Sequence, residues 1–229
     1  MVGKLFGIGV GPGDPDLVTL KAISTIGKCD VIAIPVTGND ESTALKIVEQ
    51  YLNGKELLKC RFIMEHDMEK RRASRKAAGG DIAHCLEQGK DVGFITLGDP
   101  TIYSTYMYVH EIIIDMGYEA EIIPGITSFA AAASALGIAL CEGNETLTIC
   151  AGHGGGIGEI LDTPGNKVIM KSGIGLTRVL DELKARGFED STKIACRVTM
   201  DGQRVFHSIE EYEKSPEEGY FTLAIVLGV

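Results

Sequence analysis

The sequence lacks the long apolar runs and the excess of positive charge that mark membrane proteins and nucleic-acid-binding proteins. No uninterrupted apolar stretch reaches the roughly 18 residues that a membrane-spanning helix needs. The apolar run 5–10 is short and ends in glycine and proline, without the basic segment and cleavage site of a secretory signal. Lys and Arg number 22 against 32 Asp and Glu, a formal net charge of −10. This balance argues against binding to nucleic acids or anionic membranes, so we expect a cytoplasmic protein with neither as a partner.

The cysteines and histidines lack the spacing of a metal site or a disulfide framework. The six cysteines are scattered, most of them within apolar runs, and no CxxC pair occurs. Buried free thiols in a reducing compartment are the expected state. The five histidines have no ligand-like spacing, and Cys150 with His153 forms only an isolated CxxH. The sequence therefore predicts no metal bound by the protein itself.

Glycine is abundant, at 29 residues, which indicates many tight turns and close backbone approaches. Short apolar runs alternate with helical periods, and the chain ends in an antiparallel pattern. The expected strands span 6–10, 30–35, 60–64, 92–97, 121–123, 146–151, 167–171, 194–199, 203–207 and 221–227. The expected helices span 14–27, 42–52, 69–88, 104–116, 128–136 and 176–186. This pattern predicts two α/β domains, 1–123 and 124–229, with a ligand site in the cleft between them.

The first motif is the glycine loop Gly7-Ile8-Gly9-Val10-Gly11-Pro12-Gly13-Asp14-Pro15, which follows the first expected strand. A dinucleotide fingerprint GxGxxG fails in both frames, because Pro12 and Asp14 stand where glycine is needed. The second strand ends in Ile34-Pro35, without an acidic residue for a ribose hydroxyl. A phosphate loop is absent too. The motif therefore favours a structural turn over a Rossmann nucleotide site.

The second motif, Leu97-Gly98-Asp99-Pro100-Thr101-Ile102-Tyr103-Ser104-Thr105-Tyr106, follows the most apolar strand of the first half. Loops at the carboxyl ends of strands hold the ligands of α/β proteins, and Asp99 places a carboxylate there. Ser104 is positioned to cap the next helix. The alternative is an Asx-Pro turn with packing tyrosines.

The third motif is Pro124-Gly125-Ile126-Thr127-Ser128 followed by an alanine-rich helix. Thr127 or Ser128 is the natural N-cap, and the free N–H groups of that helix end suit a carboxylate. Close packing of the helix on a sheet would explain the same alanines without any ligand.

Taken together, the three motifs closely resemble those of the tetrapyrrole (corrin/porphyrin) methyltransferases, which use S-adenosylmethionine, and the resemblance covers essentially the whole chain. Within that family, the runs from Gly98 to Tyr108 and from Thr127 to Ala133 resemble the precorrin-2 C20-methyltransferases of cobalamin synthesis. The Tyr-Ser-Thr sequence resembles the cobalt-dependent, anaerobic branch more than the aerobic one. The family implies a homodimer with S-adenosylmethionine folded between two α/β domains, S-adenosylhomocysteine as product, and cobalt only as part of the substrate.

Cofactor contacts follow from the resemblance, position by position. They would come from Pro12, Leu97, Gly98, Asp99, Ile102, Thr127, Ser128, Met170, Val198, Thr222 and Leu223. Many of these are backbone contacts in the family, so side-chain identity at Val198 and Thr222 is weak evidence. Met170 and Val198 are equally consistent with ordinary core positions.

Methyl transfer from a sulfonium needs in-line alignment and exclusion of water rather than a metal or a nucleophile. The methylated ring carbon must afterwards lose a proton, and Asp99 is the first candidate base, ahead of Tyr103 and Tyr106. A ring nitrogen of the substrate is an alternative base. The substrate carries many carboxylates, for which the cluster with Arg71, Arg72 and Arg75 is suited, although a solvated helix face explains those arginines equally well.

Other functions remain open from the sequence alone. The acceptor could be metal-free precorrin-2, or the methyl could go to another ring position. The diphthamide methyltransferases share the fold and act on a protein, but the glycine turn and the Tyr-Ser-Thr loop favour the tetrapyrrole side. A tetrapyrrole carrier or regulatory module without turnover is a further alternative from a different class.

Overall fold

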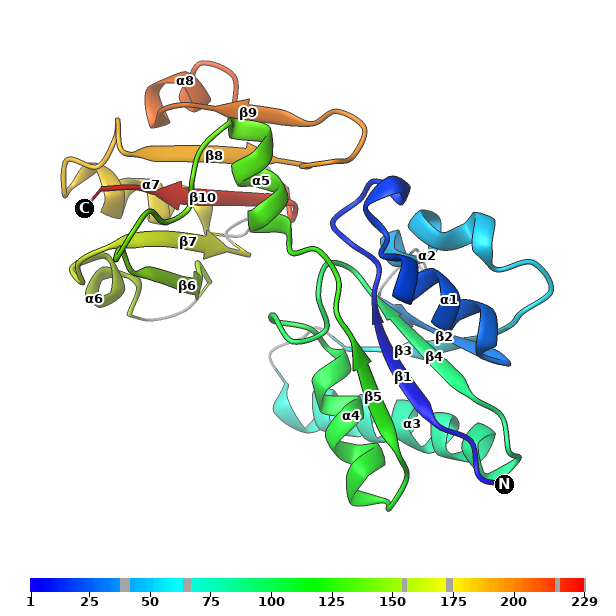
Figure 1. Ribbon diagram of the computed structural model, residues 1–229. Coiled ribbons are helices and arrows are strands. Elements are labelled where there is room, and N and C mark those ends of the chain that lie inside the picture. The colour runs from blue at the N-terminus through cyan, green and yellow to red at the C-terminus, as the bar shows by residue number, and fades with distance from the viewer. Residues whose placement is uncertain (38–41, 64–66, 154–155, 172–174, 217–218, 229) are drawn as a thin grey trace. The chain divides into compact units, whose positions relative to one another are not determined.

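The computed structural model describes residues 1–37, 42–63, 67–153, 156–171, 175–216 and 219–228. The chain divides into two compact units, Met1–Thr127 and Ser128–Val229. Each is an α/β unit, as the alternation of apolar runs and helical periods predicts (Figure 1). The sequence pattern places the break slightly earlier, between 123 and 124.

Unit 1 is built on a five-stranded sheet in the order β3-β2-β4-β1-β5. All neighbouring strands are parallel, so their carboxyl ends lie at one edge of the sheet. The strands are β1 (Leu5–Gly9), β2 (Val31–Val36), β3 (Glu56–Arg61), β4 (Val92–Thr96) and β5 (Ala120–Ile123). The inner strands β1, β2 and β4 are almost entirely buried, which explains their continuous apolar runs.

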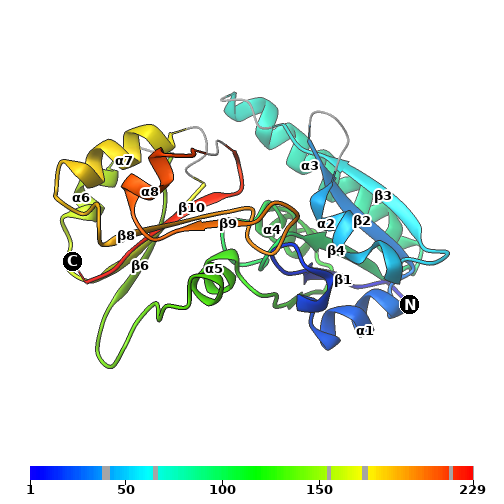
Figure 2. The ribbon, with the colours of Figure 1, turned by 90° about the horizontal axis from the view of Figure 1, so that it is seen from above.

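Helices cover both faces of this sheet, and Figure 2 shows α1 and α3 on opposite sides of it. The helices are α1 (Leu20–Lys28), α2 (Thr43–Val48), α3 (Met68–Glu87) and α4 (Tyr106–Asp115), with two single-turn 3₁₀ helices, η1 (Pro15–Leu17) and η2 (Glu49–Tyr51). The cluster that contains α1 and α2 includes Ile8 and Ile95 of the sheet. The cluster that contains α3 and α4 includes Leu5 and Phe94. The period-2 alternation of β1 and β4 therefore supplies both layers of the core.

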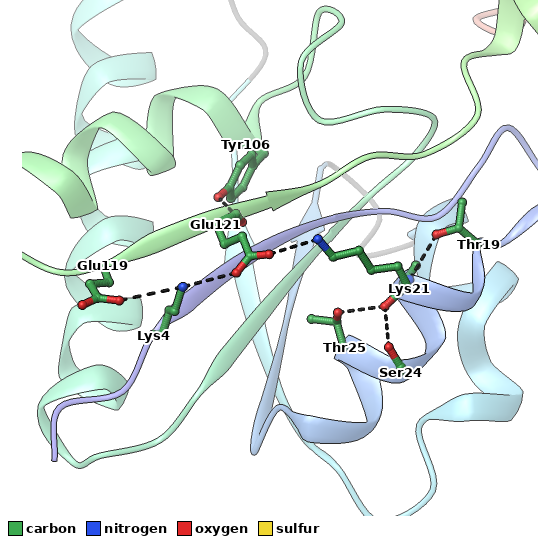
Figure 3. Close-up of polar contacts among 9 residues, drawn as sticks. Lys4, Thr19, Lys21, Ser24, Thr25, Tyr106, Glu119 and Glu121 are labelled. Atoms are coloured by element: carbon green, nitrogen blue, oxygen red, sulfur yellow. Dashed lines mark hydrogen bonds and ion pairs between the residues drawn. The ribbon is translucent and has the colours of Figure 1, made fainter.

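Charged side chains cover the outer strand β5 (Figure 3). Glu121 pairs with the Nζ of Lys4, directly before β1, at 3.2 Å and with the Lys21 Nζ of α1 at 3.1 Å. Glu119 lies 3.8 Å from the same Lys4 ammonium. These pairs tie the outer strand to its neighbouring strand and helix, and charge on an edge strand opposes pairing with another chain.

Unit 2 holds a mixed five-stranded sheet in the order β6-β7-β10-β8-β9. Only β6 and β7 run parallel, whereas β10 runs antiparallel to both β7 and β8, and β9 antiparallel to β8. The strands are β6 (Leu147–Ala151), β7 (Asn166–Met170), β8 (Thr192–Cys196), β9 (Arg204–Phe206) and β10 (Thr222–Val226). The helices are α5 (Ser128–Leu136), α6 (Ile157–Leu161), α7 (Leu176–Lys184) and α8 (Ile209–Glu213). Figure 2 shows α5 on the opposite face of the sheet from α6, α7 and α8.

The structure differs from the sequence-based predictions in three places. The helix expected from residue 14 is interrupted: Asp14 caps only η1, and α1 begins at Leu20, capped by the Thr19 hydroxyl. The strand expected at 60–64 lies at 56–61, because this outer strand is largely exposed and its apolar pattern is weak. The five-residue helices α6 and α8 have too few turns for a helical period to register in the sequence.

Candidate functional site

Strands β1 and β4 are neighbours, yet the chain leaves them in opposite directions. After β1 it passes through α1 towards β2, and after β4 it passes through α4 towards β5, on the other face of the sheet. Such a topological switch point opens a crevice at the carboxyl ends of the two strands, where open α/β sheets bind ligands. The glycine loop and the Gly-Asp-Pro loop both start there. The fold of unit 1 thus brings together two of the three motifs found in the sequence.

The two loops are bonded to each other through their backbones. The Gly98 amide donates to the Gly11 carbonyl at 2.7 Å, and the Gly11 amide donates to the Gly98 carbonyl at 3.3 Å. The loop after β5 packs against the same place, because a Cβ on Gly125 would lie 2.2 Å from the Gly98 oxygen, and a Cβ on Gly9 would lie 2.6 Å from the Gly125 nitrogen. Only glycine permits this contact of three backbones.

Asp99 is buried and its carboxylate holds these loops in place. One oxygen, Oδ2, accepts from the Gly125 amide at 2.9 Å. The other, Oδ1, accepts from the Thr101 amide at 2.8 Å and from the Thr101 hydroxyl. At 8% exposure, the carboxylate is engaged on both oxygens by its own loop and by the loop after β5. This geometry favours a positioning role for Asp99 over proton abstraction.

The two candidate tyrosines occupy different environments. Tyr106 is fully buried, beneath Gly7, where an added Cβ would lie 2.0 Å from the Tyr106 ring. Its hydroxyl lies 2.8 Å from the His110 Nδ1, and burial raises the pKa of this phenol well above its usual range. These facts argue for a packing role and against proton transfer by Tyr106. Tyr103, in contrast, is 45% exposed and has a left-handed backbone with φ of 50°.

The glycine loop has no helix N-terminus to offer a phosphate. The Asp14 side chain itself accepts from the Asp16 amide, and η1 is a single turn. The first α-helix begins only at Leu20, where the Thr19 hydroxyl already accepts from the Ala22 amide. The structure therefore agrees with the failed dinucleotide fingerprint.

The residues at the switch point fit a nucleoside cofactor without phosphates. Gly98 has a left-handed φ of 71°, and a Cβ built on it would find only the Ile126 oxygen, at 3.9 Å. A small molecule can therefore approach this backbone closely. Around it lie Pro12, which is buried, and Leu97 and Ile102, which are partly buried. Thr127 and Ser128, also partly buried, stand at the division between the units.

Four further predicted contact residues meet at one edge of the unit 2 sheet. Met170 ends β7, and Thr222 and Leu223 begin β10, which runs antiparallel to it. Thr222 pairs in register with Cys196, the last residue of β8. Val198 follows β8 and is 6% exposed. The ends of three neighbouring strands and the turns that follow them therefore converge here.

The backbone at this edge is unusual in a way that the sequence does not reveal. Lys171, directly after β7, has a φ of 53°, and Arg197 and Thr199, on either side of Val198, have φ of 49° and 62°. Left-handed non-glycine residues are costly and cluster at functional sites. No residue type in the sequence marks these positions, since asparagine and glycine, the usual left-handed residues, are absent from them.

The predicted substrate arginines lie on the first turns of α3. Arg72 is exposed, and Arg71 and Arg75 are partly buried. The Arg75 guanidinium carbon lies 3.4 Å from the centre of the Tyr108 ring of α4. Stacking fixes the plane of the guanidinium and leaves its N–H edge available for carboxylates.

The described parts of the chain hold no cluster of three or more His, Cys, Asp or Glu side chains able to bind a metal ion. None of the six cysteines, all of them described, forms a disulfide; five are buried, and Cys141 is exposed. Burial raises the pKa of the Cys29 and Cys60 thiols to about 12. Among the helices of the described residues, none is long and apolar enough to cross a membrane.

Sequence reasoning identified Asp99 but missed its partners. Gly125 and Thr101 were quoted within the motifs without a role, although both bind the carboxylate. The N-cap of α4 is Thr105 and not Ser104, although the Ser104 hydroxyl accepts from the Tyr106 amide at 3.1 Å and lies 2.9 Å from the Thr96 hydroxyl. The Gly125 contact joins positions 26 residues apart, which no local pattern encodes.

Comparison with known proteins agrees with this geometry. The family model described as "Tetrapyrrole (Corrin/Porphyrin) Methylases" matches residues 4–212. The chain is 34% identical to the probable cobalt-precorrin-2 C(20)-methyltransferase of Methanocaldococcus jannaschii, over 99% of this chain and 96% of the relative. It is 31% identical to the cobalt-precorrin-2 C(20)-methyltransferase of Salmonella typhimurium, over 99% of this chain and 97% of the relative.

Solved structures share the fold. A cobalt precorrin-4 methyltransferase superposes with a TM-score of 0.78 at 20% identity, covering 97% of this chain and 94% of the other. The uroporphyrin-III C-methyltransferase of Thermus thermophilus, complexed with S-adenosylhomocysteine, superposes with a TM-score of 0.71 at 20% identity, covering 98% and 92%. With a family model that matches most of its length and two relatives above 30% identity across nearly all of it, the chain belongs to the tetrapyrrole (corrin/porphyrin) methylases.

Proposed function

We propose that this protein transfers a methyl group from S-adenosylmethionine to C20 of cobalt-precorrin-2, giving cobalt-precorrin-3, in the anaerobic synthesis of cobalamin. The observation that carries the proposal is the full-length similarity to two relatives named for this reaction. The switch-point crevice of unit 1, with its loops joined at Gly11 and Gly98, supplies a site of the required kind.

S-adenosylmethionine supplies a methyl group that its sulfonium already activates. In this proposal the chain holds that cofactor with the backbones of Pro12 and of Leu97 to Asp99, with Ile102 beside them. The open flank of Gly98 permits the close approach, and Asp99 fixes the loop through Gly125 and Thr101. Further proposed contacts are Thr127, Ser128, Met170, Val198, Thr222 and Leu223.

The acceptor is a polycarboxylate, whereas the protein carries a formal net charge of −10. We propose that Arg71, Arg72 and Arg75 provide a local positive surface for some of those carboxylates. Of the three, Arg75 stacks on Tyr108, and this contact orients its guanidinium. Cobalt enters as part of the substrate. A cytoplasmic location and a homodimer complete the proposal, on the strength of the family resemblance.

Mass spectrometry of the tetrapyrrole tests the reaction. The pure protein is incubated anaerobically with S-adenosylmethionine and precorrin-2, in parallel with and without cobalt. We expect one added methyl group on the cobalt form, placed at C20 by NMR of labelled product. Equal methylation of both forms would remove the cobalt preference and keep the reaction. Methylation at another carbon, or of neither form while S-adenosylhomocysteine still binds, would overturn the proposed substrate.

A further inference from the structure

Tyr103 combines a left-handed backbone with an accessible aromatic side chain. Its backbone has a φ of 50°, in the region that residues other than glycine seldom adopt. Its side chain is 45% exposed, so a ligand can reach part of the ring. A strained conformation persists only where the surrounding structure enforces it, and such residues are concentrated at ligand-binding positions.

The structure enforces this conformation from both sides of the residue. On the N-terminal side, Asp99 binds the Thr101 amide and hydroxyl and the Gly125 amide. On the C-terminal side, the Ser104 hydroxyl binds Thr96 at 2.9 Å and accepts from the Tyr106 amide at 3.1 Å. The loop is thereby fixed to the end of β4, to the loop after β5 and to the start of α4. Tyr103 stands between these two anchors.

The location of the residue points to its ligand. The loop lies at the carboxyl end of β4, beside the switch point, and the predicted cofactor contacts Leu97, Gly98 and Ile102 belong to the same loop. A tetrapyrrole is a broad ring system whose carboxylates lie on its periphery. Its faces are apolar, and an aromatic side chain is a suitable surface for them. The arginines of α3 suit the periphery, whereas Tyr103 suits the face.

We infer that the Tyr103 ring packs against the macrocycle of the acceptor tetrapyrrole, and that the doubly anchored loop holds the ring in place for this contact. Tyr103 is then a residue that binds substrate through its ring, and its hydroxyl takes no part in proton transfer. The inference rests on the proposed function, which supplies the tetrapyrrole.

The test compares Tyr103→Phe with Tyr103→Gly. The phenylalanine variant keeps the ring and the strain and removes only the hydroxyl. We expect its kcat and its KM for cobalt-precorrin-2 to change far less than those of the glycine variant. The glycine variant removes the ring and relieves the strained φ, so its urea midpoint should not fall. We expect its KM for the tetrapyrrole to rise about tenfold, with unchanged affinity for S-adenosylhomocysteine.

An unchanged KM in Tyr103→Gly would overturn the inference, and so would an equal loss of kcat in both variants, which would assign the hydroxyl to proton transfer. Binding of uroporphyrin, an air-stable tetrapyrrole polycarboxylate, followed by its absorbance, separates this result from the proposed function. If the wild type binds uroporphyrin in a Tyr103-dependent way but methylates no precorrin, the inference holds and the proposed function fails. If the wild type binds no tetrapyrrole at all, both fail.

Discussion

Asp99 shows how one buried carboxylate determines the geometry of a binding loop. Both of its oxygens accept hydrogen bonds, from Thr101 within the loop and from Gly125 of the next loop. Bonds from backbone amides to a carboxylate are stronger than neutral ones, because the acceptor is charged. This geometry favours a role for the Asp99 carboxylate in holding the two loops in position. The sequence alone is equally consistent with a general base at this residue.

Replacing Asp99 by Asn distinguishes the two roles. The amide group would set its NH₂ against one of the N–H donors, so we expect the free energy of unfolding to fall by about 1–3 kcal/mol. Affinity for S-adenosylhomocysteine should fall as well, since the loop loses its anchor. Calorimetric titration and urea denaturation measure these quantities. Thr101→Val, which removes one hydroxyl partner, should show a smaller loss of both. A normal affinity and stability with a lower kcat would instead identify Asp99 as the base.

Tyr106→Phe examines the buried tyrosine. The hydroxyl lies 2.8 Å from the His110 Nδ1 inside unit 1. Its loss should lower stability by about 0.5–1.5 kcal/mol, the usual net contribution of a hydrogen bond, and leave methyl transfer nearly unchanged. Thermal unfolding and an activity assay on the same preparation check both parts. A large loss of turnover without loss of stability would place Tyr106 in the chemistry after all.

At the scale of elements, the contact between α3 and α4 depends on one glycine of a pair. A Cβ on Gly79 would lie 2.6 Å from the Ile112 Cγ2 of α4, whereas a Cβ on Gly80 would meet nothing within 4 Å. Glycine weakens a helix interior, yet α3 runs unbroken through this pair from Met68 to Glu87. The packing of α3 against α4 therefore requires glycine at position 79 but not at position 80.

The two alanine variants should therefore shift stability in opposite directions. Gly80→Ala should stabilise the protein by about 0.5–1 kcal/mol, because alanine restricts the unfolded chain and suits a helix. Gly79→Ala should destabilise it by about 1–3 kcal/mol through overpacking against α4. The urea midpoints of the two variants and of the wild type show whether the stability changes have opposite signs. Equal effects would mean that the helices adjust without cost.

The outer strand β5 gives a pH-dependent contribution to stability. Hydrogen bonds from Lys21 and Lys4 to Glu121 lower the pKa of this carboxyl below its usual value. A group with a lowered folded-state pKa stabilises the protein above the pKa of the unfolded chain, and loses that effect as the pH falls through the folded-state pKa. The pairs are exposed, so the contribution is modest.

Glu121→Gln tests this contribution. The variant should be less stable than the wild type at pH 7, and the difference should shrink as the pH is lowered into the acid range. High salt at pH 7 should also reduce it. Urea midpoints at pH 7, 5 and 3 provide the measurement. A difference that stays constant with pH would show that Glu121 acts through packing and not through its charge.

At the scale of the whole molecule, each unit has its own hydrophobic core. The clusters of unit 1 lie on the two faces of its sheet, and a third cluster, which includes Leu183, belongs to unit 2. We predict that Leu183→Ala, which removes a fully buried side chain, weakens unit 2 by about 2–5 kcal/mol and leaves unit 1 protected. Hydrogen exchange followed by mass spectrometry resolves the two. Faster exchange throughout β1 to β5 would show that the units unfold together.

The sequence predicted the alternating α/β plan because the inner strands are buried on both sides and read as continuous apolar runs, as at Val92–Thr96. It failed where burial is slight, as in β3, and where helices have about one turn, as in α6. The glycine and Gly-Asp-Pro motifs indicated the two loops that meet at the ends of β1 and β4, since turns and strand ends have local signatures. What joins these loops, the contacts of Asp99 and Gly125, depends on the order of the strands, which no local pattern contains.

The contact of three backbones at Gly9, Gly98 and Gly125 has a consequence for protein engineering. A library that randomises Gly9 or Gly125 should yield almost only misfolded variants, because any side chain there would overlap a neighbouring main chain. Selection for new acceptors must therefore draw its diversity from elsewhere, and Tyr103 of the neighbouring loop is an exposed position outside that contact. In this way the fold can keep S-adenosylmethionine as the methyl donor while the methyl acceptor changes.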